Sequence, residues 1–360
     1  MGRARETVLF AILTLLLSWA VGWLWIRHPE QGWLTQWLMW MPGLVGLGLS
    51  WLLRREPPSA VGLAFTGPGP WLLAFLYPFF MVGTAVALGY AVRQVKGDAG
   101  FIYFQPEAVA TGGWLGLPRR PGLSLLWLRL LRNVWLILPW LLVALVYQKR
   151  GPERLRAALP QRLRFLHHGL RWALAGLVLW AYPGPLAPPG AIGEELGWRG
   201  TLVRRWADRP LMAVALTAPL WALFHVPVAL APTQAGHLLQ NVVFLASIAA
   251  GAAPFAALYV WSRSVWPCVV LHFNWNFWNP FVLGDVYGGG AGLFGGAIWA
   301  INGEGLFGLL INGAVSAGLI VYWRRRRALS PTTASATEPE LHEVRAAAAG
   351  RIEEGRSGGS

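Results

Sequence analysis

The sequence predicts an all-α protein, a polytopic membrane helix bundle of about eight to ten membrane helices built around a core of roughly four. Of the 360 residues, 55% are hydrophobic and only 13% are charged, about half the charged share of a soluble domain. Mean hydropathy is +0.46. The apolar runs are long and continuous rather than dyadic alternations of about ten residues, which indicates helices and not an outer-membrane barrel. This composition excludes a soluble enzyme, a disordered protein and a coiled coil.

The charge balance is consistent with a protein whose main solvent is lipid. The formal net charge is +14, and in membrane proteins an excess of Lys and Arg usually collects in cytoplasmic loops. We therefore expect the lipid bilayer, and not nucleic acid, as the surrounding partner. The expected location is a cell membrane, crossed several times, and the cytoplasmic membrane if the source is prokaryotic. The single cysteine, Cys268, excludes an intrachain disulfide.

Runs of about 20 apolar residues give the predicted membrane helices in chain order. The N-terminal membrane region, residues 1–171, contains no recognised motif and has four such runs: Val8–Ile26, Trp33–Leu53, Trp71–Val92 and Leu123–Tyr147. The core region, residues 172–283, starts with a helix at Trp172 and has three more runs: Leu211–Leu230, Leu239–Trp261 and Ser264–Leu283.

The C-terminal part of the chain divides into two segments. Residues 284–327 combine a Gly-rich stretch, which we interpret as a flexible extramembrane loop, with a last membrane helix over Phe307–Trp323. Residues 328–360 have no apolar period and are rich in Ala, Ser, Thr, Glu and Gly. This composition predicts a disordered cytoplasmic tail.

Three basic clusters orient the predicted bundle: residues 148–171, the arginines of 199–209, and Arg324–Arg327. If all three are cytoplasmic, Trp172–Trp206 must return to the side where it began. As one helix that stretch would be about 52 Å long, too long for a single crossing. Its prolines therefore predict a break followed by a re-entrant or second helix.

The candidate functional residues are ionisable groups within apolar sequence. Each costs roughly 2.5–3.5 kcal/mol or more at a helix centre, so such groups are rare and usually functional. Between residues 155 and 283 there are three acids, and two histidines lie within apolar runs: Glu194, Glu195, Asp208, His225 and His272.

Helical geometry separates the two adjacent glutamates. Successive residues project about 100° apart, so Glu194 and Glu195 cannot both aim at one point. Glu195 and Arg199 are four residues apart with the acid first, the favoured order for an ion pair. This leaves Glu194 to face something else. Taken alone, the segment also fits an interfacial helix whose charges contact only lipid headgroups.

Two further helices carry polar pairs at the same spacing. Trp221 and His225 share one helix face, and so do His272 and Asn276. Taken alone, each fits a structural role: a buried histidine bonded to a carbonyl, or polar side chains that join membrane helices. Together with Glu194, the three segments supply a carboxylate base, imidazoles and an amide donor, the groups that activate a water and stabilise an oxyanion.

Other nucleophile and metal motifs are missing from the sequence. There is no Gly-x-Ser-x-Gly and no His-Glu-x-x-His. Cys268 lies four residues before His272 within the same apolar run, so a cysteine nucleophile is unsupported as well.

The ordered series Glu-Glu-x-x-x-Arg, aromatic-x-x-x-His and His-x-x-x-Asn resembles the CPBP family. This family comprises CAAX-protease and bacteriocin-processing intramembrane proteases and includes the Rce1-type prenyl-protein endopeptidase. The resemblance covers residues 172–283. It implies an intramembrane endopeptidase that hydrolyses a peptide bond of a peptide or membrane-protein substrate, at or within the membrane. Trp221 stands where the family often has Phe, a change we expect to leave the chemistry intact.

The resemblance also implies roles for individual residues. Glu194, together with His225, is expected to take a proton from the attacking water, and His272 and Asn276 to donate to the oxyanion. The supporting residues are Glu195, Arg199 and Trp221. All four catalytic side chains should then surround one cavity.

Two questions stay open at this point, the metal and the reaction itself. Glu194, His225 and His272 would supply three ligands to a divalent metal such as zinc, with a fourth position for water, whereas a carboxylate-only mechanism needs no metal. Alternatively, the same three residues form the proton relay of a transporter, although no internal repeat supports this. A further alternative is a non-catalytic membrane chaperone or immunity scaffold that keeps the fold and binds peptides.

Overall fold

The computed structural model describes six stretches of the chain: residues 2–31, 33–56, 58–105, 188–230, 237–284 and 291–329. The predicted span Leu123–Tyr147, the basic cluster at 148–171, the helix start at Trp172 and the tail beyond residue 329 lie outside the described residues. The chain divides into two units, Met1–Leu319 and Ile320–Ser360. In the second unit, the described part is the last portion of the final helix.

The described residues are almost entirely helical, which confirms the predicted fold class. The long helices are α1 (Arg3–Arg27), α2 (Trp33–Arg54), α3 (Pro68–Lys96), α11 (Leu238–Ser262), α12 (Val265–Leu283) and α14 (Leu306–Leu329). The shorter ones are η1 (Pro58–Val61), α8 (Pro188–Gly197), η2 (Trp198–Val203), α9 (Pro210–Phe224), α10 (Val226–Ala229) and α13 (Ile298–Ile301). Two three-residue strands complete the set, β1 (Ile102–Phe104) and β2 (Phe294–Gly296).

Four segments of the described chain are long and apolar enough to cross a membrane: α1, α3, α11 and Ile298–Arg326. The predicted spans Trp33–Leu53 and Ser264–Leu283 are also continuous helices, α2 and α12. A helix begins at Pro188, one of the prolines that predicted a break. A membrane protein with several crossings is therefore supported, while the total of eight to ten helices stays a prediction.

The predicted span Leu211–Leu230 is not a single helix. α9 ends at Phe224, and His225 forms a turn before the single turn of α10. The cause is Pro227, which has no N–H and whose ring conflicts with the carbonyl of Leu223 four residues earlier. That carbonyl instead accepts a hydrogen bond from the Trp19 indole N–H at 2.8 Å. The break matters because it places His225 at a helix end.

Part of the Gly-rich stretch expected to be a loop forms a strand. β2 pairs antiparallel with β1, with Ile102 opposite Gly296 and Phe104 opposite Phe294. Gly296 has φ +125°, a conformation that favours glycine. Strand pairing between segments so distant in the sequence leaves no local pattern, so the sequence did not predict it. Gly288–Gly290 lie outside the described residues.

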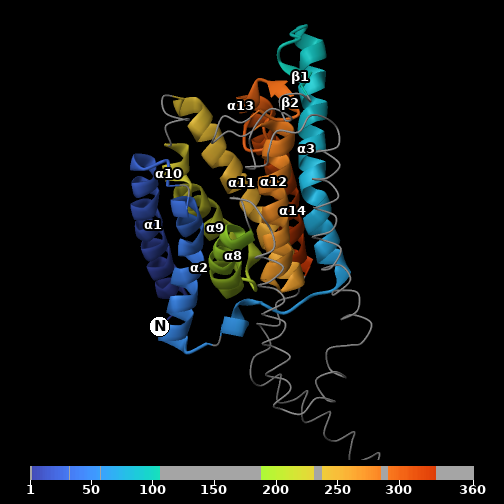
Figure 1. The fold of residues 1–360 in the computed structure, drawn as a ribbon. Coiled ribbons are helices and arrows are strands. Elements are labelled where there is room, and N and C mark those ends of the chain that lie inside the picture. Colours follow the sequence, from blue (N-terminus) through green and yellow to red (C-terminus); the bar gives the residue numbers. More distant parts are fainter. Residues whose placement is uncertain are drawn as a thin grey trace, which may run out of the picture. The chain divides into compact units, whose positions relative to one another are not determined.

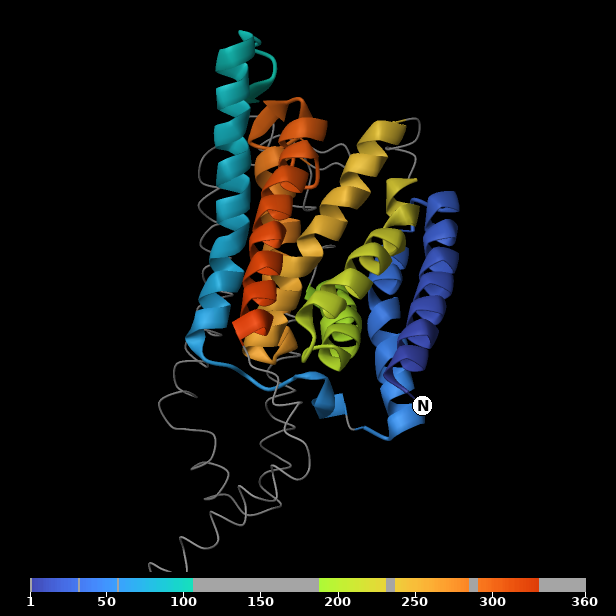
Figure 2. The same ribbon diagram turned by 180° about the vertical axis from the view of Figure 1, so that it is seen from behind.

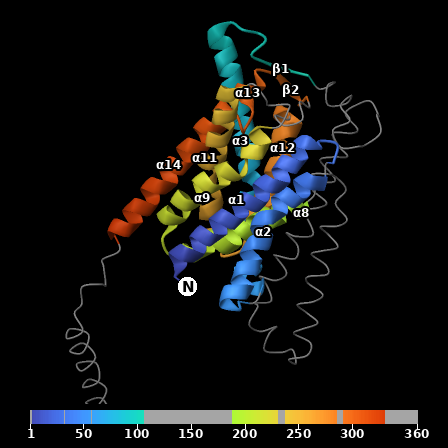
Figure 3. The same cartoon turned by 90° about the vertical axis from the view of Figure 1, so that its left-hand side faces the viewer.

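The helices of the unit Met1–Leu319 are arranged with α8 and α9 between two groups (Figures 1 and 2). α1 and α2 pack together on one side, and α3 packs against α12 on the other. α11 lies between α9 and α12 and contacts both. The two strands and α13 lie at the end of the bundle away from the N-terminus (Figure 3). The short helix α8, which carries the two glutamates, is therefore in the interior.

Glycines on α8 and α2 let these two helices approach closely. Gly193 and Gly197 flank the two glutamates with small-xxx-small spacing, which typically allows close backbone contact between membrane helices. A Cβ added at Gly193 would lie 2.6 Å from the Cα of Trp40, and one added at Gly197 would overlap Pro42. The glycines thus fix the position of the glutamates relative to α2.

An ion-pair network joins the N-terminal part of α1, the segment after α2 and the end of η2. Arg205 bonds both Glu6 (3.0 Å) and Glu56 (2.8 Å), and Arg54 and Arg204 pair with the same two acids. Partial burial raises the pKa of Glu56, but hydrogen bonds from Arg205 and Arg204 outweigh it and lower the pKa to about 2. Arg204 and Arg205, read in the sequence as part of a basic cluster, are therefore bound to carboxylates.

The close contact between α2 and α8 predicts that Gly193→Ala destabilises the protein by about 1–3 kcal/mol, the usual cost of overpacking. The added methyl must push against backbone atoms of α2, which cannot move as a side chain can. Gly48→Ala on α2 is the matched control, because a Cβ there meets nothing within 4 Å. The measurement is the thermal unfolding midpoint in nanodiscs. Equal midpoints for both variants would contradict the proposed contact.

Candidate active site

The predicted site residues meet at one interior cavity of about 250 Å³. Five of them line it: Glu194, Trp221, His225, His272 and Asn276. They come from α8, the end of α9, the turn after it and α12. The expectation that these side chains surround a single cavity is confirmed, whereas their chemical roles stay predictions.

Glu194 faces the cavity and is held by Trp221. Its side chain is buried, with 1% of the residue exposed, and the Trp221 indole N–H donates to Oε2 at 2.9 Å. Phenylalanine has no such donor. Tryptophan at this position therefore adds a hydrogen bond to the glutamate that the sequence did not predict, while the expectation that it leaves the chemistry intact stays a prediction.

Glu195 points away from the cavity and binds two partners. Arg199 Nη1 donates to its Oε1 at 3.0 Å, which confirms the predicted pairing. The same oxygen lies 2.8 Å from His272 Nδ1, a contact that the sequence did not predict. All three residues are buried. One carboxylate thus links α8 to α12 and orients the His272 ring.

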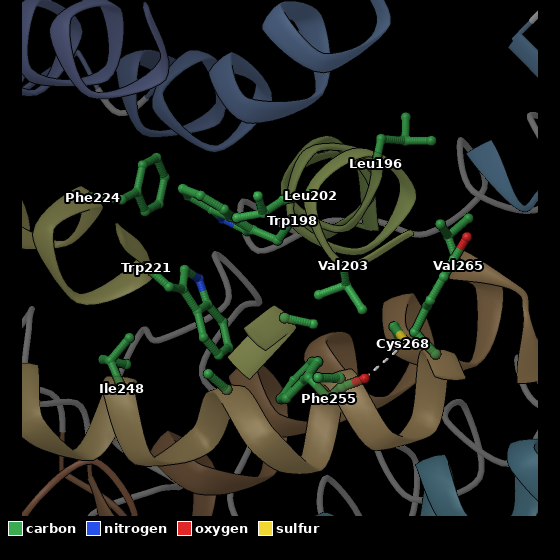
Figure 4. Close-up of a cluster of buried hydrophobic side chains, with 14 of the residues drawn as sticks. Leu196, Trp198, Leu202, Val203, Trp221, Phe224, Ile248, Phe255, Val265 and Cys268 are labelled. Atoms are coloured by element: carbon green, nitrogen blue, oxygen red, sulfur yellow. Dashed lines mark hydrogen bonds between the residues drawn. The ribbon is translucent and has the colours of Figure 1, made fainter. Parts of the chain in front are cut away.

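The guanidinium of Arg199 is enclosed by aromatic rings. Its Cζ lies 4.1 Å from the centre of the Trp221 ring and 4.3 Å from that of Phe255. The two rings lie close together in an edge-to-face arrangement (Figure 4). Nε and Nη2 have no hydrogen-bond partner among the described residues, so the ring faces supply the favourable contact for the buried cation. Trp221 therefore contacts both Glu194 and Arg199.

A π-helical segment follows the two glutamates. η2 comprises Trp198–Val203, and Thr201 Oγ1 donates to the carbonyl of Leu196, five residues earlier, at 3.1 Å. The Trp198 ring packs edge-on against Phe10 and against Phe224, which is labelled beside it in Figure 4. Such π segments inside helices are frequent at functional sites. Here the segment joins the glutamate helix to the arginines of the ion-pair network.

The hydrogen bonds of the two histidines assign their ring nitrogens. His225 Nδ1 lies 2.8 Å from the carbonyl of Trp221, and His272 Nδ1 lies 2.8 Å from Glu195. A carbonyl and an ionised carboxylate only accept, so Nδ1 is the protonated nitrogen in both rings. In a neutral ring this leaves a lone pair on Nε2. Only the charged form of His272 has an Nε2–H to donate.

The proposed metal ligands are not gathered as a metal site. Among the described residues, no group of three or more His, Cys, Asp or Glu side chains is arranged to hold a metal ion. Glu194, His225 and His272 share the cavity wall without forming such a group. A divalent metal at these three residues therefore stays a prediction.

Glu304 is a cavity residue that the sequence reasoning missed. It lies between α13 and α14, is 6% exposed, and lines the same cavity as Glu194. Trp275 donates its indole N–H to Oε1 at 2.9 Å. The sequence does show Glu304 as an acid within an apolar stretch, which is the signal that identified Glu194. Glu304 was not considered because it lies after residues 172–283, the segment that carries the three motifs. Trp25, Thr35 and Gln36 also line the cavity, so the N-terminal region contributes a wall without a recognisable motif.

Cys268 is not part of this cavity. It is fully buried, is not among the lining residues, and its Sγ lies 3.7 Å from the carbonyl of Phe255 (Figure 4). This position agrees with the expectation that no cysteine nucleophile operates here.

Comparison with known protein families gives a match over the part of the chain that carries these residues. Residues 156–278 match the family model described as "Type II CAAX prenyl endopeptidase Rce1-like". This segment is Rce1-like. The match confirms the resemblance drawn from the three motifs and includes Glu194, His225, His272 and Asn276. It covers about a third of the chain. No curated protein and no solved structure is similar enough to be matched.

The Rce1-like match gives a family-level activity, CAAX-protease-like endopeptidase activity in the membrane. For the membrane setting, it agrees with the four long apolar segments of the described chain. The specific chemistry has to be argued from the side chains.

The contact between Trp221 and Glu194 predicts that Trp221→Phe lowers kcat for a reporter peptide about tenfold. Phenylalanine keeps a ring against Arg199 but removes a hydrogen bond to a charged group, typically about 1.5–3 kcal/mol. The matched control is Trp266→Phe, which removes an indole bond to the Leu63 carbonyl (2.9 Å) away from the cavity. Turnover should be compared at equal folded fractions. Equal turnover in both variants would show that the Trp221 bond does not serve the reaction.

Proposed function

We propose that this protein is an intramembrane endopeptidase in which Glu194 activates a water molecule to hydrolyse a peptide bond. The observation that carries the proposal is the meeting of Glu194, His225, His272 and Asn276 at one cavity, inside the segment that matches the Rce1-like family. A glutamate, two imidazoles and an amide are sufficient for general-base catalysis and oxyanion stabilisation.

In the first step, the carboxylate of Glu194 takes a proton from water while the water oxygen bonds to the peptide carbonyl carbon. The indole of Trp221 holds Oε2 of Glu194, which leaves Oε1 for the water. His225, with Nδ1 engaged by the Trp221 carbonyl, offers the Nε2 lone pair as a second acceptor for the same water. A base must be within hydrogen-bond reach of the proton it removes, and the position of both residues on the lining of one cavity supports this.

In the second step, His272 and Asn276 stabilise the negative oxygen of the tetrahedral intermediate. In its charged form His272 keeps Nδ1–H on Glu195 and donates Nε2–H to the oxyanion. Asn276 follows on the same face of α12 and donates an amide N–H. The proton held by Glu194 then passes to the leaving nitrogen as the C–N bond breaks, which restores the carboxylate.

Glu195 and Arg199 position these groups without touching the substrate. Glu195 joins α8 to His272, and Arg199 balances its charge in the interior. Removing one member of a buried ion pair usually costs about 3–5 kcal/mol, because the remaining charge is uncompensated. Substitution of Glu195 or Arg199 is therefore expected to lower activity by destabilising the fold.

The different roles proposed for Glu194 and Glu195 give the test of this proposal. Glu194→Gln is nearly isosteric and removes the base, so cleavage of a reporter peptide in nanodiscs should be abolished at an unchanged unfolding midpoint. Glu195→Gln should lower the midpoint and reduce activity only in part. Activity retained in Glu194→Gln would overturn the proposal. Complete loss in both variants at normal stability would contradict the separate roles.

Asn276 provides an independent prediction about the transition state. A donor to the oxyanion acts mainly in the transition state, so Asn276→Ala should lower kcat by about 10²–10³ with little change in KM. Asn276→Asp should be worse, because it loses the donor and adds negative charge beside the developing oxyanion.

The readouts are kcat, KM and the unfolding midpoint for both variants on the same peptide. If Asn276 only packs helices together, Ala should be the more damaging substitution and activity should follow stability. Near-normal turnover in Asn276→Ala would return Asn276 to that packing role.

A further inference from the structure

The cavity has a polar pair on the wall formed by α3 and α14 that the proposed reaction does not use. Tyr77 comes from α3 and Asn312 from α14, and both line the cavity. Both lie outside residues 156–278, the segment that matches the Rce1-like family. Asn312 is 6% exposed. A buried amide is costly unless its polar atoms find hydrogen-bond partners, so its place on a cavity wall calls for a physical account.

The first part of α14 is fixed against its neighbours, which gives Asn312 a defined position. Phe307, near the start of α14, belongs to one buried apolar cluster with Met81 of α3, and this part of α14 lies beside α3 (Figure 2). One turn after Asn312, the hydroxyl of Ser316 donates to the carbonyl of Ala250 on α11 at 2.6 Å. The helix that carries the amide is therefore held from two sides.

The hydroxyl of Tyr77 sets the orientation of the Asn312 amide. It donates to Oδ1 at 2.8 Å, so the acceptor end of the amide is engaged within the protein. This is the one hydrogen bond that the Asn312 side chain makes within the described residues. The other end, Nδ2, carries two N–H groups and is left to the cavity that Asn312 lines.

Other side-chain donors on the cavity wall are bonded to acceptors of the protein. The indole of Trp221 donates to Glu194, and the hydroxyl of Ser247 donates to the carbonyl of Gly303 at 3.3 Å. Asn312 differs from them, because within the described residues its acceptor atom is bonded and its donor atom is not. A group in this state can offer only N–H donors to a ligand.

A peptide that enters this cavity needs such a donor. Much of the wall is apolar, with Met39, Ile248 and Leu271 among the lining residues. A backbone carbonyl placed there loses its hydrogen bonds to water, and leaving it unpaired is costly. A neutral amide N–H matches a carbonyl, which only accepts, and places no requirement on the neighbouring side chain.

We propose that Asn312 binds a backbone carbonyl of the peptide substrate, and that Tyr77 is the positioning residue that orients its amide. The bound carbonyl is not the one attacked by water, which faces His272 and Asn276. This inference rests on the proposed endopeptidase function, because that function places a peptide in the cavity. The bond holds the peptide against the wall formed by α3 and α14 and so fixes its register relative to Glu194.

The binding experiment uses the full-length Glu194→Gln protein in nanodiscs, so that no peptide is consumed. The probes are an Ala/Leu heptapeptide and analogues in which one backbone amide at a time is replaced by an ester or is N-methylated. An ester weakens the carbonyl as an acceptor and removes the N–H, whereas N-methylation removes the N–H alone. At one position we expect the ester to bind about fivefold more weakly than the parent peptide, the effect of one neutral hydrogen bond.

The N-methyl analogue at that position should bind within about twofold of the parent peptide, because its carbonyl is still a good acceptor. Sensitivity to N-methylation at every position where the ester weakens binding would mean that a peptide N–H is recognised instead of a carbonyl. That outcome, the absence of any ester effect, or a parent peptide that does not bind would each overturn the proposal.

Variants in the same background connect the ester effect to Asn312. In Asn312→Ala the ester and the parent peptide should bind within about twofold of each other, because no donor remains. Tyr77→Phe removes the hydroxyl that orients the amide and should reduce the ester effect only in part. Ser316→Ala is the matched control, since it removes a hydrogen bond one turn further along α14 and outside the cavity lining. It should keep the ester effect in full.

The same variants identify a purely structural role. If Asn312 and Tyr77 only join α3 to α14, Asn312→Ala should lower the unfolding midpoint and weaken the binding of all peptides equally. An ester effect that persists in Asn312→Ala, or that Ser316→Ala also removes, would likewise assign Asn312 to packing.

Cleavage of the all-amide peptide by the otherwise unmodified chain separates this proposal from the proposed function. A backbone contact made equally in the ground and transition states changes KM and not kcat. Asn312→Ala should therefore raise KM about fivefold at nearly unchanged kcat, the reverse of Asn276→Ala. If no peptide is cleaved but the ester effect depends on Asn312, the endopeptidase function fails and the binding site stands. Cleavage with an unchanged KM in Asn312→Ala would overturn the binding site alone.

Discussion

The carboxylate of Glu195, shared by Arg199 and His272, is the interaction on which the rest of the site depends. It lies in the interior, where an isolated charge would be very costly, and it is bonded to one group on its own helical segment and one on α12. The rings of Trp221 and Phe255 enclose the arginine and so bring α9 and α11 into the same cluster. Four elements are held together by a single buried charge and its partners.

This arrangement explains why the side chains of two adjacent glutamates have such different surroundings. The helical turn sends Glu195 into the packed interior and Glu194 into the cavity. Gly193 and Gly197, on either side, allow α8 to lie against the backbone of α2. If α8 moved away from α2, Glu194 and the ion pair of Glu195 would shift together. The packing of these two helices therefore also sets the position of Glu194, the proposed base, and a shift of about 1 Å in a reacting group is enough to impair catalysis.

The cavity also shows how two buried acids are held in an apolar interior. Glu194 and Glu304 each accept an indole N–H, from Trp221 and Trp275 respectively. Indole is a suitable partner in an apolar interior, because it contributes one donor and no charge. Each carboxylate is thus oriented by an uncharged donor. The side chains of Asn279 and Asn302 fix the turn that carries Glu304. In the same way, the contact between α2 and α8 fixes the helix that carries Glu194.

The sequence by itself predicted the helical membrane class, the meeting of Glu194, His225, His272 and Asn276 at one cavity, and the pairing of Glu195 with Arg199. The first and the third follow from composition and from helical spacing, which are local properties, whereas the second was suggested by the combination and order of three motifs. Only the tertiary structure decided that His272 binds Glu195, that Trp221 holds Glu194, that Pro227 ends α9 at His225, and that Glu304 and the N-terminal helices complete the cavity. Each of these depends on contacts between residues far apart in the chain or on backbone sterics around a single residue. No periodicity records such contacts, because they arise only when the helices pack.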